Sequence, residues 1–217
     1  MELILASSSP RRQQMLKDLN LNFRVFNPKI NETKLRGEPA LNYAQRLSIQ
    51  KAECASIGLG FLNKKTTGEL VSIQLEKDWA ILSADTLVVL GVSTLGKPKN
   101  QDEALQFLLK LSGKNHEVLT AFCWLGIVKG KLSIYQSHVR TRVSFAKMST
   151  SFWKWYASTK EPLDKAGAYA AQGAGMSFIE KVTGSYSNIV GLPLTHVLQS
   201  FLKTFGVDIR ESCSKLN

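Results

Sequence analysis

The first twelve residues combine a short apolar run, a serine-rich turn and the start of a helix. The run Leu3–Ala6 has the length and composition of a buried strand. Ser9 is a favoured N-cap residue, and Pro10 suits the first helical position because its missing N–H would have no partner there. A strand that passes directly into a helix is the building unit of α/β folds, so the chain is expected to belong to that class.

Two arginines, Arg11 and Arg12, occupy the first turn of this expected helix. The N-terminus of a helix carries about half a positive charge, which repels two guanidinium groups placed there. A bound phosphate would reverse the sign, because free backbone N–H groups, serine hydroxyls and guanidinium forks would converge on it. The alternative is a solvated first turn with both arginines pointing into water, and this segment alone does not decide between the two.

The rest of the chain alternates apolar runs with helical patterns, which predicts an α/β fold. Further strands are expected at Phe23–Phe26, Ala80–Ala84 continuing to Thr86–Leu90, Glu117–Val128, Leu132–Phe145 and Met176–Val182. Helices are expected at Pro10–Leu19, Leu41–Ile57, Asp102–Leu111, Thr150–Ser158 and Leu194–Phe205. The segment Lys129–Lys131 joins two long alternating runs as a hairpin turn, so the sheet should be mixed rather than purely parallel.

The length of 217 residues fits one domain or two small lobes. We expect a single domain over residues 1–217, with a loop insertion at residues 59–79 and a tail at residues 206–217. The insertion carries weakly alternating residues that suggest an exposed loop with a β-hairpin.

The sequence contains neither a run of the kind that spans a membrane nor the features of a secretory signal. No apolar run approaches the roughly 20 residues that span a bilayer, and the chain starts Met-Glu without a basic n-region. We therefore expect a cytoplasmic protein that has no membrane partner. Cys54, Cys123 and Cys213 are widely spaced and are expected to be reduced thiols, two in the core and one in the tail, with no zinc site.

The formal net charge of +11 is compatible with nucleic acid, an anionic membrane surface or a polyphosphate substrate as partner. The basic residues are dispersed and few aromatic residues lie among them, whereas nucleic-acid tracts are usually more concentrated. A solvated basic surface explains most of this charge most simply.

Asp85 interrupts the hydrophobic run Ala80–Leu90 with a carboxylate. Burying an unpaired charge costs several kcal/mol, so this carboxylate must be neutralised, hydrogen-bonded or placed where the strand opens into a cleft. A metal or general-base role would explain it. The alternative is a structural carboxylate that accepts backbone N–H groups at a strand kink.

Other chemical candidates are weaker when taken one at a time. Lys97 lies between a glycine and a proline, which fixes its backbone for a phosphate contact, although a lone surface lysine is commoner. Lys51 and Arg46 lie on one amphipathic helix and could simply line its wet side. Gln172 follows a run of small residues and could pair with a nucleobase edge. His116 is expected to be structural, and no Walker, GxSxG or HExxH motif is present.

Six segments together resemble the Maf family of nucleoside triphosphate pyrophosphatases. They are LILASSSPRR, YAQRLSIQKA, ILSADTLVVLG, LGKPKNQDEALQFLLKLSGKNHEVLTA, EPLDKAGAYAAQGAG and GSYSNIVGLPL, and they follow the family's order across nearly the whole chain. The resemblance implies an α/β fold like that of inosine triphosphate pyrophosphatases, with a mixed twisted sheet flanked by helices and a central cleft between two lobes. It also implies cleavage of a nucleoside triphosphate to the monophosphate and pyrophosphate, with Mg²⁺ or Mn²⁺ as cofactor.

The resemblance assigns a role to each matching residue. Asp85 would accept the proton of the attacking water, alone or while holding the metal, and Glu32 is the second candidate metal ligand. Phosphate contacts are implied for Ser8, Arg11, Arg12, Lys51 and Lys97. Gln172, with Arg11 and Thr86, matches the branch that acts on dTTP and UTP, whereas a branch that acts on 7-methyl-GTP has Glu in place of this Gln.

The resemblance also implies a homodimer. Its departures are the 59–79 insertion, Ala170–Ala171 in place of the usual Gly–Ile, and the basic tail, and these bear on substrate breadth more than on the reaction. A different class of function would be a non-catalytic basic protein that binds nucleic acid or the cell-division machinery. Release of pyrophosphate from dTTP or UTP would distinguish an enzyme from such a binder, which would instead retain RNA or DNA with a steep salt dependence.

Overall fold

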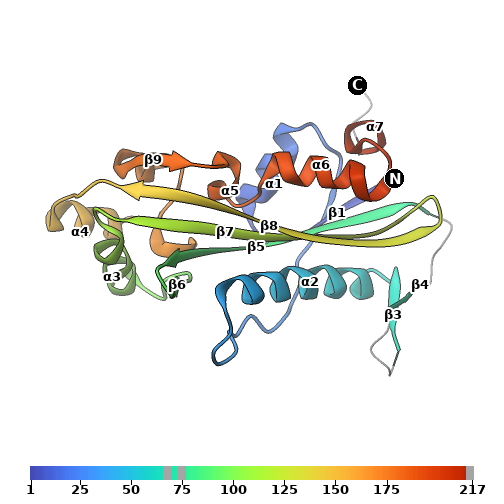
Figure 1. Cartoon of the computed structure of the whole chain (residues 1–217), viewed down its shortest axis with the longest axis horizontal. Helices are drawn as coiled ribbons and strands as arrows, with labels where there is room; N and C mark the ends of the chain where they lie inside the picture. The colour runs from blue at the N-terminus through green and yellow to red at the C-terminus, as the bar shows by residue number, and fades with distance from the viewer. Residues whose placement is uncertain (66–69, 73–76, 214–217) are drawn as a thin grey trace. The chain divides into compact units, whose positions relative to one another are not determined.

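A computed structural model of the chain describes residues 1–65, 70–72 and 77–213. Seven strands form one sheet in the order β2-β1-β5-β7-β8-β9, with β6 paired to β5, and β3 pairs with β4 in a separate two-stranded sheet (Figure 1). The strands are β1 (Glu2–Ala6), β2 (Arg24–Phe26), β3 (Leu62–Lys64), β4 (Leu70–Ser72), β5 (Trp79–Leu90), β6 (Ser93–Leu95), β7 (Asn115–Val128), β8 (Lys131–Phe145) and β9 (Ile179–Thr183). The α-helices are α1 (Pro10–Asp18), α2 (Ala40–Gly58), α3 (Gln101–Leu111), α4 (Thr150–Ser158), α5 (Tyr186–Val190), α6 (Leu194–Phe205) and α7 (Ile209–Cys213).

The sheet is mixed, as the sequence predicted. Strand β1 is parallel to both β2 and β5, whereas β6 is antiparallel to β5 and β9 is antiparallel to β8. The predicted α/β class with a mixed sheet flanked by helices is therefore confirmed.

The chain divides into two compact units. Unit 1 contains residues 1–85, 121–138 and the chain from residue 194 onward, and unit 2 contains residues 86–120 and 139–193. Strands β5, β7 and β8 contribute residues to both units.

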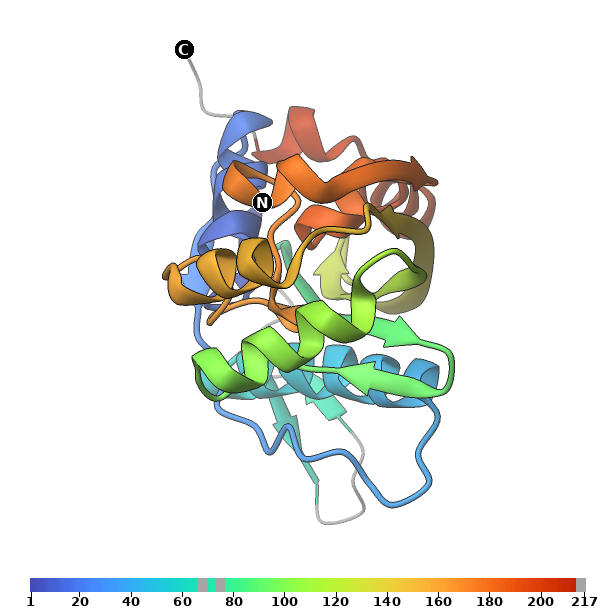
Figure 2. The same cartoon turned by 90° about the vertical axis from the view of Figure 1, so that its left-hand side faces the viewer.

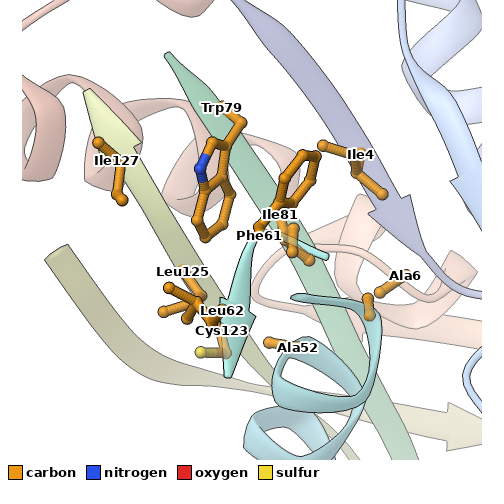
Figure 3. Packing of buried hydrophobic residues seen from close by; sticks show 11 residues of the cluster. Ile4, Ala6, Ala52, Phe61, Leu62, Trp79, Ile81, Cys123, Leu125 and Ile127 are labelled. Atoms are coloured by element: carbon orange, nitrogen blue, oxygen red, sulfur yellow. The ribbon is translucent and has the colours of Figure 1, made fainter. Parts of the chain in front are cut away.

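In unit 1, strand β7 is buried on both faces, which explains its nearly continuous apolar sequence. Cys123, Leu125 and Ile127 point into a cluster that includes Ala52 of α2 (Figure 3). Between them, Trp124 packs edge-on against Phe201 of α6, with ring centroids 4.9 Å apart. Alternate residues of this strand therefore hold two different helices.

The same core contains a stacked aromatic pair. The rings of Phe61 and Trp79 lie 4.6 Å apart at an interplanar angle of 14°, and both side chains belong to the cluster in Figure 3. Gly126 lies against the backbone of Trp79. A Cβ at this position would come within 2.4 Å of the Trp79 carbonyl oxygen. The close approach of β7 to β5 thus requires glycine at position 126.

Unit 2 has an aromatic core centred on Phe178. Its ring centroid lies 4.9 Å from Phe145, 4.8 Å from Trp153 and 4.9 Å from Tyr156, with edge-on geometry in each case. Such pairs contribute about 0.5–1.5 kcal/mol each beyond the area they bury. Helix α4, which supplies Trp153 and Tyr156, lies beside α3 (Figure 2).

The helix caps and the hairpin turn that the sequence predicted are present in the structure. Ser9 caps α1 by accepting from the Arg12 amide at 3.5 Å, and Asn100 caps α3 by accepting from the Glu103 amide at 2.9 Å. The Glu103 carboxylate accepts from the amide of Lys99, rather than from that of the cap residue. Between β7 and β8, Lys129 and Gly130 both adopt positive φ values of 52° and 72°, as a tight two-residue hairpin requires.

Two expectations about element boundaries and one about the cysteines differ from the structure. The strand expected at Met176–Val182 begins only at Ile179, because residues 173–178 form a 3₁₀ helix that buries Phe178. The expected tail contains α7, whose Ile209 and Cys213 are buried; residues 214–217 lie outside the described part. The cysteines in the core are Cys123 and Cys213, whereas Cys54 is half-buried, and all three are free thiols.

The segment 59–79 contains the expected hairpin, since β3 and β4 pair antiparallel. Its first residues are not an exposed loop, because Phe61 and Leu62 are buried in the core of unit 1. Residues 66–69 and 73–76 of this segment lie outside the described residues. Among the described helices, none is long and apolar enough to cross a membrane.

His116 is buried in unit 2, and this burial should make stability depend on pH. Its Nε2 lies 2.8 Å from the Tyr169 hydroxyl, and burial lowers the pKa of the imidazole from 6.5 to about 4. The unfolded chain therefore takes up a proton in a pH range where the folded protein does not. We expect the free energy of unfolding to fall by up to about 3 kcal/mol as the pH drops from 6.5 to 4.

Urea unfolding of the wild type and of His116→Gln across this pH range would test the expectation. The variant should lose most of the slope, whereas His138→Gln, at an exposed histidine, should keep it. An equal slope in the wild type and His116→Gln would contradict the assignment.

Candidate active site

A buried ion pair links the centre of β5 to α2. The Lys51 Nζ lies 2.7 Å from Asp85 Oδ1, and both residues are 8% exposed. Of the alternatives that the sequence left open for Asp85, neutralisation by a cation is the one observed. Strand β5 runs without a break from Trp79 to Leu90, so the carboxylate lies within a regular strand.

Glu32 completes the group around the ammonium. Its Oε1 lies 2.9 Å from Lys51 Nζ, and its side chain is 57% exposed. Two carboxylates from separate segments thus converge on one cation, one of them buried and one open to solvent.

Arg12, which lies in the first turn of α1, is buried beside this pair. Its Nη1 donates to the carbonyl of Ala84 at 2.8 Å and to the Ser7 hydroxyl at 3.2 Å. Burial lowers the pKa of Arg12, and the Asp85 carboxylate acts in the opposite direction. The strand–turn–helix at the N-terminus therefore brings a guanidinium to the residue immediately before Asp85.

The neighbouring residues of this turn behave differently. Arg11 is only half-buried, and Ser8 is exposed. Ser7, which was not among the predicted site residues, accepts a hydrogen bond from the Arg12 guanidinium. The only available signal was its place directly after the buried strand, where side-chain direction alternates.

The loop between β2 and α2, which carries Glu32, is fastened to α2 by two side chains. The Tyr43 hydroxyl donates to the Glu32 carbonyl at 2.6 Å. Arg46 makes a bidentate pair with Glu38 at 2.7 and 2.8 Å and also donates to the Thr33 carbonyl at 3.1 Å. Arg46, which could have lined the wet side of the helix, instead holds this loop.

Three predicted site residues belong to unit 2. Thr86 Oγ1 lies 2.9 Å from Thr120 Oγ1 and donates to the Gly191 carbonyl at 3.3 Å. Lys97 is exposed on the turn between β6 and α3, and the preceding residue, Gly96, accepts from the Gly167 amide at 3.0 Å. Gln172 is exposed and has an extended backbone.

The donor set in unit 1 suits a hard divalent cation that is shared with phosphates. Among the described residues, no group of three or more His, Cys, Asp or Glu side chains could enclose a metal. Mg²⁺, however, usually takes only one or two protein carboxylates and completes its shell with water and substrate oxygens. Asp85 and Glu32, which already converge on a cation, fit that requirement.

Arg12, Lys51, Asp85 and Glu32 thus supply two cations and two carboxylates, and all except Glu32 lie in the segments that gave the family resemblance. A family model described as Maf-like protein matches residues 2–204. The chain belongs to the Maf-like protein family.

Several members of the family are similar over most of their length. A dTTP/UTP pyrophosphatase of Anaeromyxobacter dehalogenans is 42% identical over 192 residues, which cover 88% of each chain. Proteins of the same description from Syntrophus aciditrophicus and Symbiobacterium thermophilum are 39% and 38% identical, covering 94% and 96% of this chain and 90% and 96% of theirs. The solved structure of the Staphylococcus aureus Ham1 protein matches with a TM-score of 0.46 and 11% identity, covering 94% of this chain and 98% of that one.

The Arg46–Glu38 contact should make the Glu32 loop sensitive to acid. Hydrogen bonding from the Arg46 guanidinium lowers the pKa of Glu38 from 4.5 to about 2. A lowered carboxylate pKa contributes stability that is present above pH 4.5 and is lost as the pH falls toward 2. We expect the protection factors of the amides in residues 33–38, which compare each exchange rate with the intrinsic rate at the same pH, to fall over that range in the wild type.

Glu38→Gln should already show low protection factors at pH 7, with little further change in acid. Glu2→Gln is the matched control, because Glu2 pairs with Arg24 at 3.5 Å on an exposed surface where such pairs contribute little. High protection factors in Glu38→Gln that do not change with pH would show that this pair does not hold the loop.

Proposed function

We propose that this protein hydrolyses dTTP and UTP to the corresponding monophosphate and pyrophosphate. The observation that carries the proposal is the buried Lys51–Asp85 ion pair with Arg12 on the adjacent carbonyl. The relatives named dTTP/UTP pyrophosphatase support the choice of substrates.

In this proposal Asp85 is the general base. A water oxygen attacks the α-phosphorus, its proton passes to the Asp85 carboxylate, and the bond from the α-phosphorus to the bridging oxygen breaks to release pyrophosphate. A carboxylate within a strand is held in one place, which suits proton transfer to a positioned group.

The cations stabilise the charge that grows on the leaving pyrophosphate. Arg12 and Lys51 are buried, and buried charges act more strongly on phosphate oxygens than solvated ones do. Arg11, Lys97 and Ser8 are assigned to further phosphate contacts, for which their half-buried or exposed side chains are accessible. The positive net charge of +11 also attracts a polyanionic substrate.

Asp85 and Glu32 are the residues that would hold the divalent metal implied by the family resemblance, Mg²⁺ or Mn²⁺. When bound, such an ion supplies positive charge beside the phosphates and makes a nearby water more acidic. The Lys51 ammonium forms an ion pair with each of these carboxylates and limits their mutual repulsion in the free protein.

Base recognition is assigned to unit 2. Gln172 offers a carbonyl and an amide from one plane, which can answer the N3–H and O4 of uracil or thymine. Its side chain is exposed, so it is accessible to a base. Thr86 is the second residue assigned to this branch of the family. The homodimer and the cytoplasmic location stay predictions.

Replacing Asp85 with asparagine should lower the rate of pyrophosphate release from UTP by about 10²–10⁴-fold, the usual scale for losing a general base. Nucleotide binding should persist, because asparagine keeps the size of the side chain. Asp78→Asn is the matched control, since Asp78 accepts from the Lys129 amide in the same unit. Near wild-type turnover of Asp85→Asn at saturating Mg²⁺ would show that Asp85 is not the general base. If the wild type showed no turnover but retained RNA in a salt-sensitive way, the nucleic-acid-binding alternative would be favoured.

Gln172→Glu should lower kcat/KM for dTTP and UTP selectively. A carboxylate is an acceptor only and would face the O4 acceptor with repulsion, a loss of about 1–3 kcal/mol or roughly 5- to 150-fold in specificity. The comparison is made across UTP, dTTP, CTP and GTP. Gln101→Glu, at an exposed position of α3, should leave the profile unchanged. An equal drop for all four nucleotides in Gln172→Glu would mean that Gln172 does not read the base.

A further inference from the structure

The turn that carries Gln172 is wrapped around the carboxylate of Glu161. The amide of Ala174 donates to Glu161 Oε2 at 3.1 Å, and the amide of Gly175 donates to Oε1 at 3.0 Å. Hydrogen bonds to a charged acceptor are stronger and more directional than neutral ones. The carboxylate thus fixes the backbone on the C-terminal side of Gln172.

Tyr156 connects the same carboxylate to the other side of the turn. Its hydroxyl donates to Glu161 Oε1 at 2.9 Å and accepts from the Ala170 amide at 3.1 Å. The Tyr156 ring is fully buried in the aromatic core, so its hydroxyl is held by packing. One chain of hydrogen bonds therefore runs from Ala170 through Tyr156 and Glu161 to Gly175.

Glycines allow the turn to close this tightly. A Cβ at Gly175 would lie 2.0 Å from the Ala170 carbonyl oxygen. Gly173 has a φ of 68°, and a Cβ there would lie 2.7 Å from Glu161 Oε2. Neither position has room for a side chain, which leaves Gln172 as the residue whose polar side chain the turn can present.

A third side chain holds the residue next to Gln172. The Tyr186 hydroxyl donates to the Ala171 carbonyl at 2.9 Å. Gln172 itself has an exposed side chain on an extended backbone. The turn is therefore fixed on both sides of one exposed amide, an arrangement that a loop without a positioning task does not need.

We propose that Glu161 is a positioning residue for base discrimination and acts through Tyr156 and the turn at residues 170–175 to orient Gln172. This inference rests on the proposed role of Gln172 as the residue that reads the base. An amide selects between O4–N3–H and the reversed order only if its plane and rotation are fixed, because a rotated amide matches cytosine as well. A supporting group that fixes the backbone to within about 0.5 Å supplies that constraint.

The test measures kcat/KM for UTP, CTP and GTP in Glu161→Gln. Glutamine keeps the shape, but its amide nitrogen cannot accept from a backbone N–H. We expect the UTP/CTP ratio of kcat/KM to fall about tenfold, mainly through a higher KM for UTP, with kcat at saturating UTP within about twofold of the wild type. Glu117→Gln is the matched control, since Glu117 pairs with Arg140 at 2.8 Å in the same unit and should leave the ratio unchanged.

Tyr156→Phe provides a second variant if Glu161→Gln fails to fold, as judged by circular dichroism and thermal melting. It removes one hydroxyl and keeps the buried ring, so it should lower the UTP/CTP ratio in the same direction. If either variant folds and keeps the wild-type UTP/CTP ratio of kcat/KM, the proposal is wrong.

A double mutant separates this inference from the proposed function. If Glu161 acts through Gln172, then Glu161→Gln should leave the UTP/CTP ratio of Gln172→Ala unchanged, because the two effects cannot add. A further fall of the ratio in the double mutant would show that Glu161 acts by another route and would overturn the inference. If Gln172→Ala alone leaves the base profile unchanged, the proposed base reader and the inference that rests on it are both wrong. If Gln172→Ala shifts the profile and Glu161→Gln does not, only the inference fails.

Discussion

The contact between Lys51 and Asp85 is the constraint around which unit 1 is organised. Two opposite charges with 8% exposure each are 2.7 Å apart, and removing each of them from water costs several kcal/mol. Buried pairs of this kind contribute little to stability compared with apolar residues of the same volume. Their presence at the centre of a strand is therefore better explained by chemistry than by folding, and the parallel pairing of β1 with β5 places Arg12 on the adjoining carbonyl.

Local chemistry made much of this arrangement predictable. Ser9 and Asn100 cap helices because their side chains can accept from amides three residues ahead. The two long alternating runs predicted a hairpin turn at Lys129–Lys131, and the structure places that turn at Lys129 and Gly130. Asp85 stood out because an apolar strand cannot leave a carboxylate unpaired. These are signals carried by a few neighbouring residues, and each is confirmed.

What the sequence did not predict depends on contacts between distant segments. Arg12 reaches the Ala84 carbonyl only because β1 pairs with β5, and Arg46 meets Glu38 only because the loop folds back along α2. The 3₁₀ turn at residues 173–178 replaces the first three residues of a predicted strand, and two amides of this turn donate to the Glu161 carboxylate, 13 and 14 residues earlier in the chain. The spacing of apolar residues does not show which distant side chains meet. The assignments of Lys97, Thr86 and Gln172 therefore came from the family resemblance and stay proposals.

The parallel pairing of β1 with β5 also constrains how the chain is made. Arg12 and its acceptor Ala84 are 72 residues apart, which at about 5–20 residues per second corresponds to roughly 4 to 14 seconds of synthesis. During that interval the apolar strand at the N-terminus has one edge without its native neighbour, and such edges are prone to pair with other chains. Arg12, the first member of the Arg12, Glu32, Lys51 and Asp85 cluster to be synthesised, therefore cannot make its native contact until the strand that ends the cluster has been made.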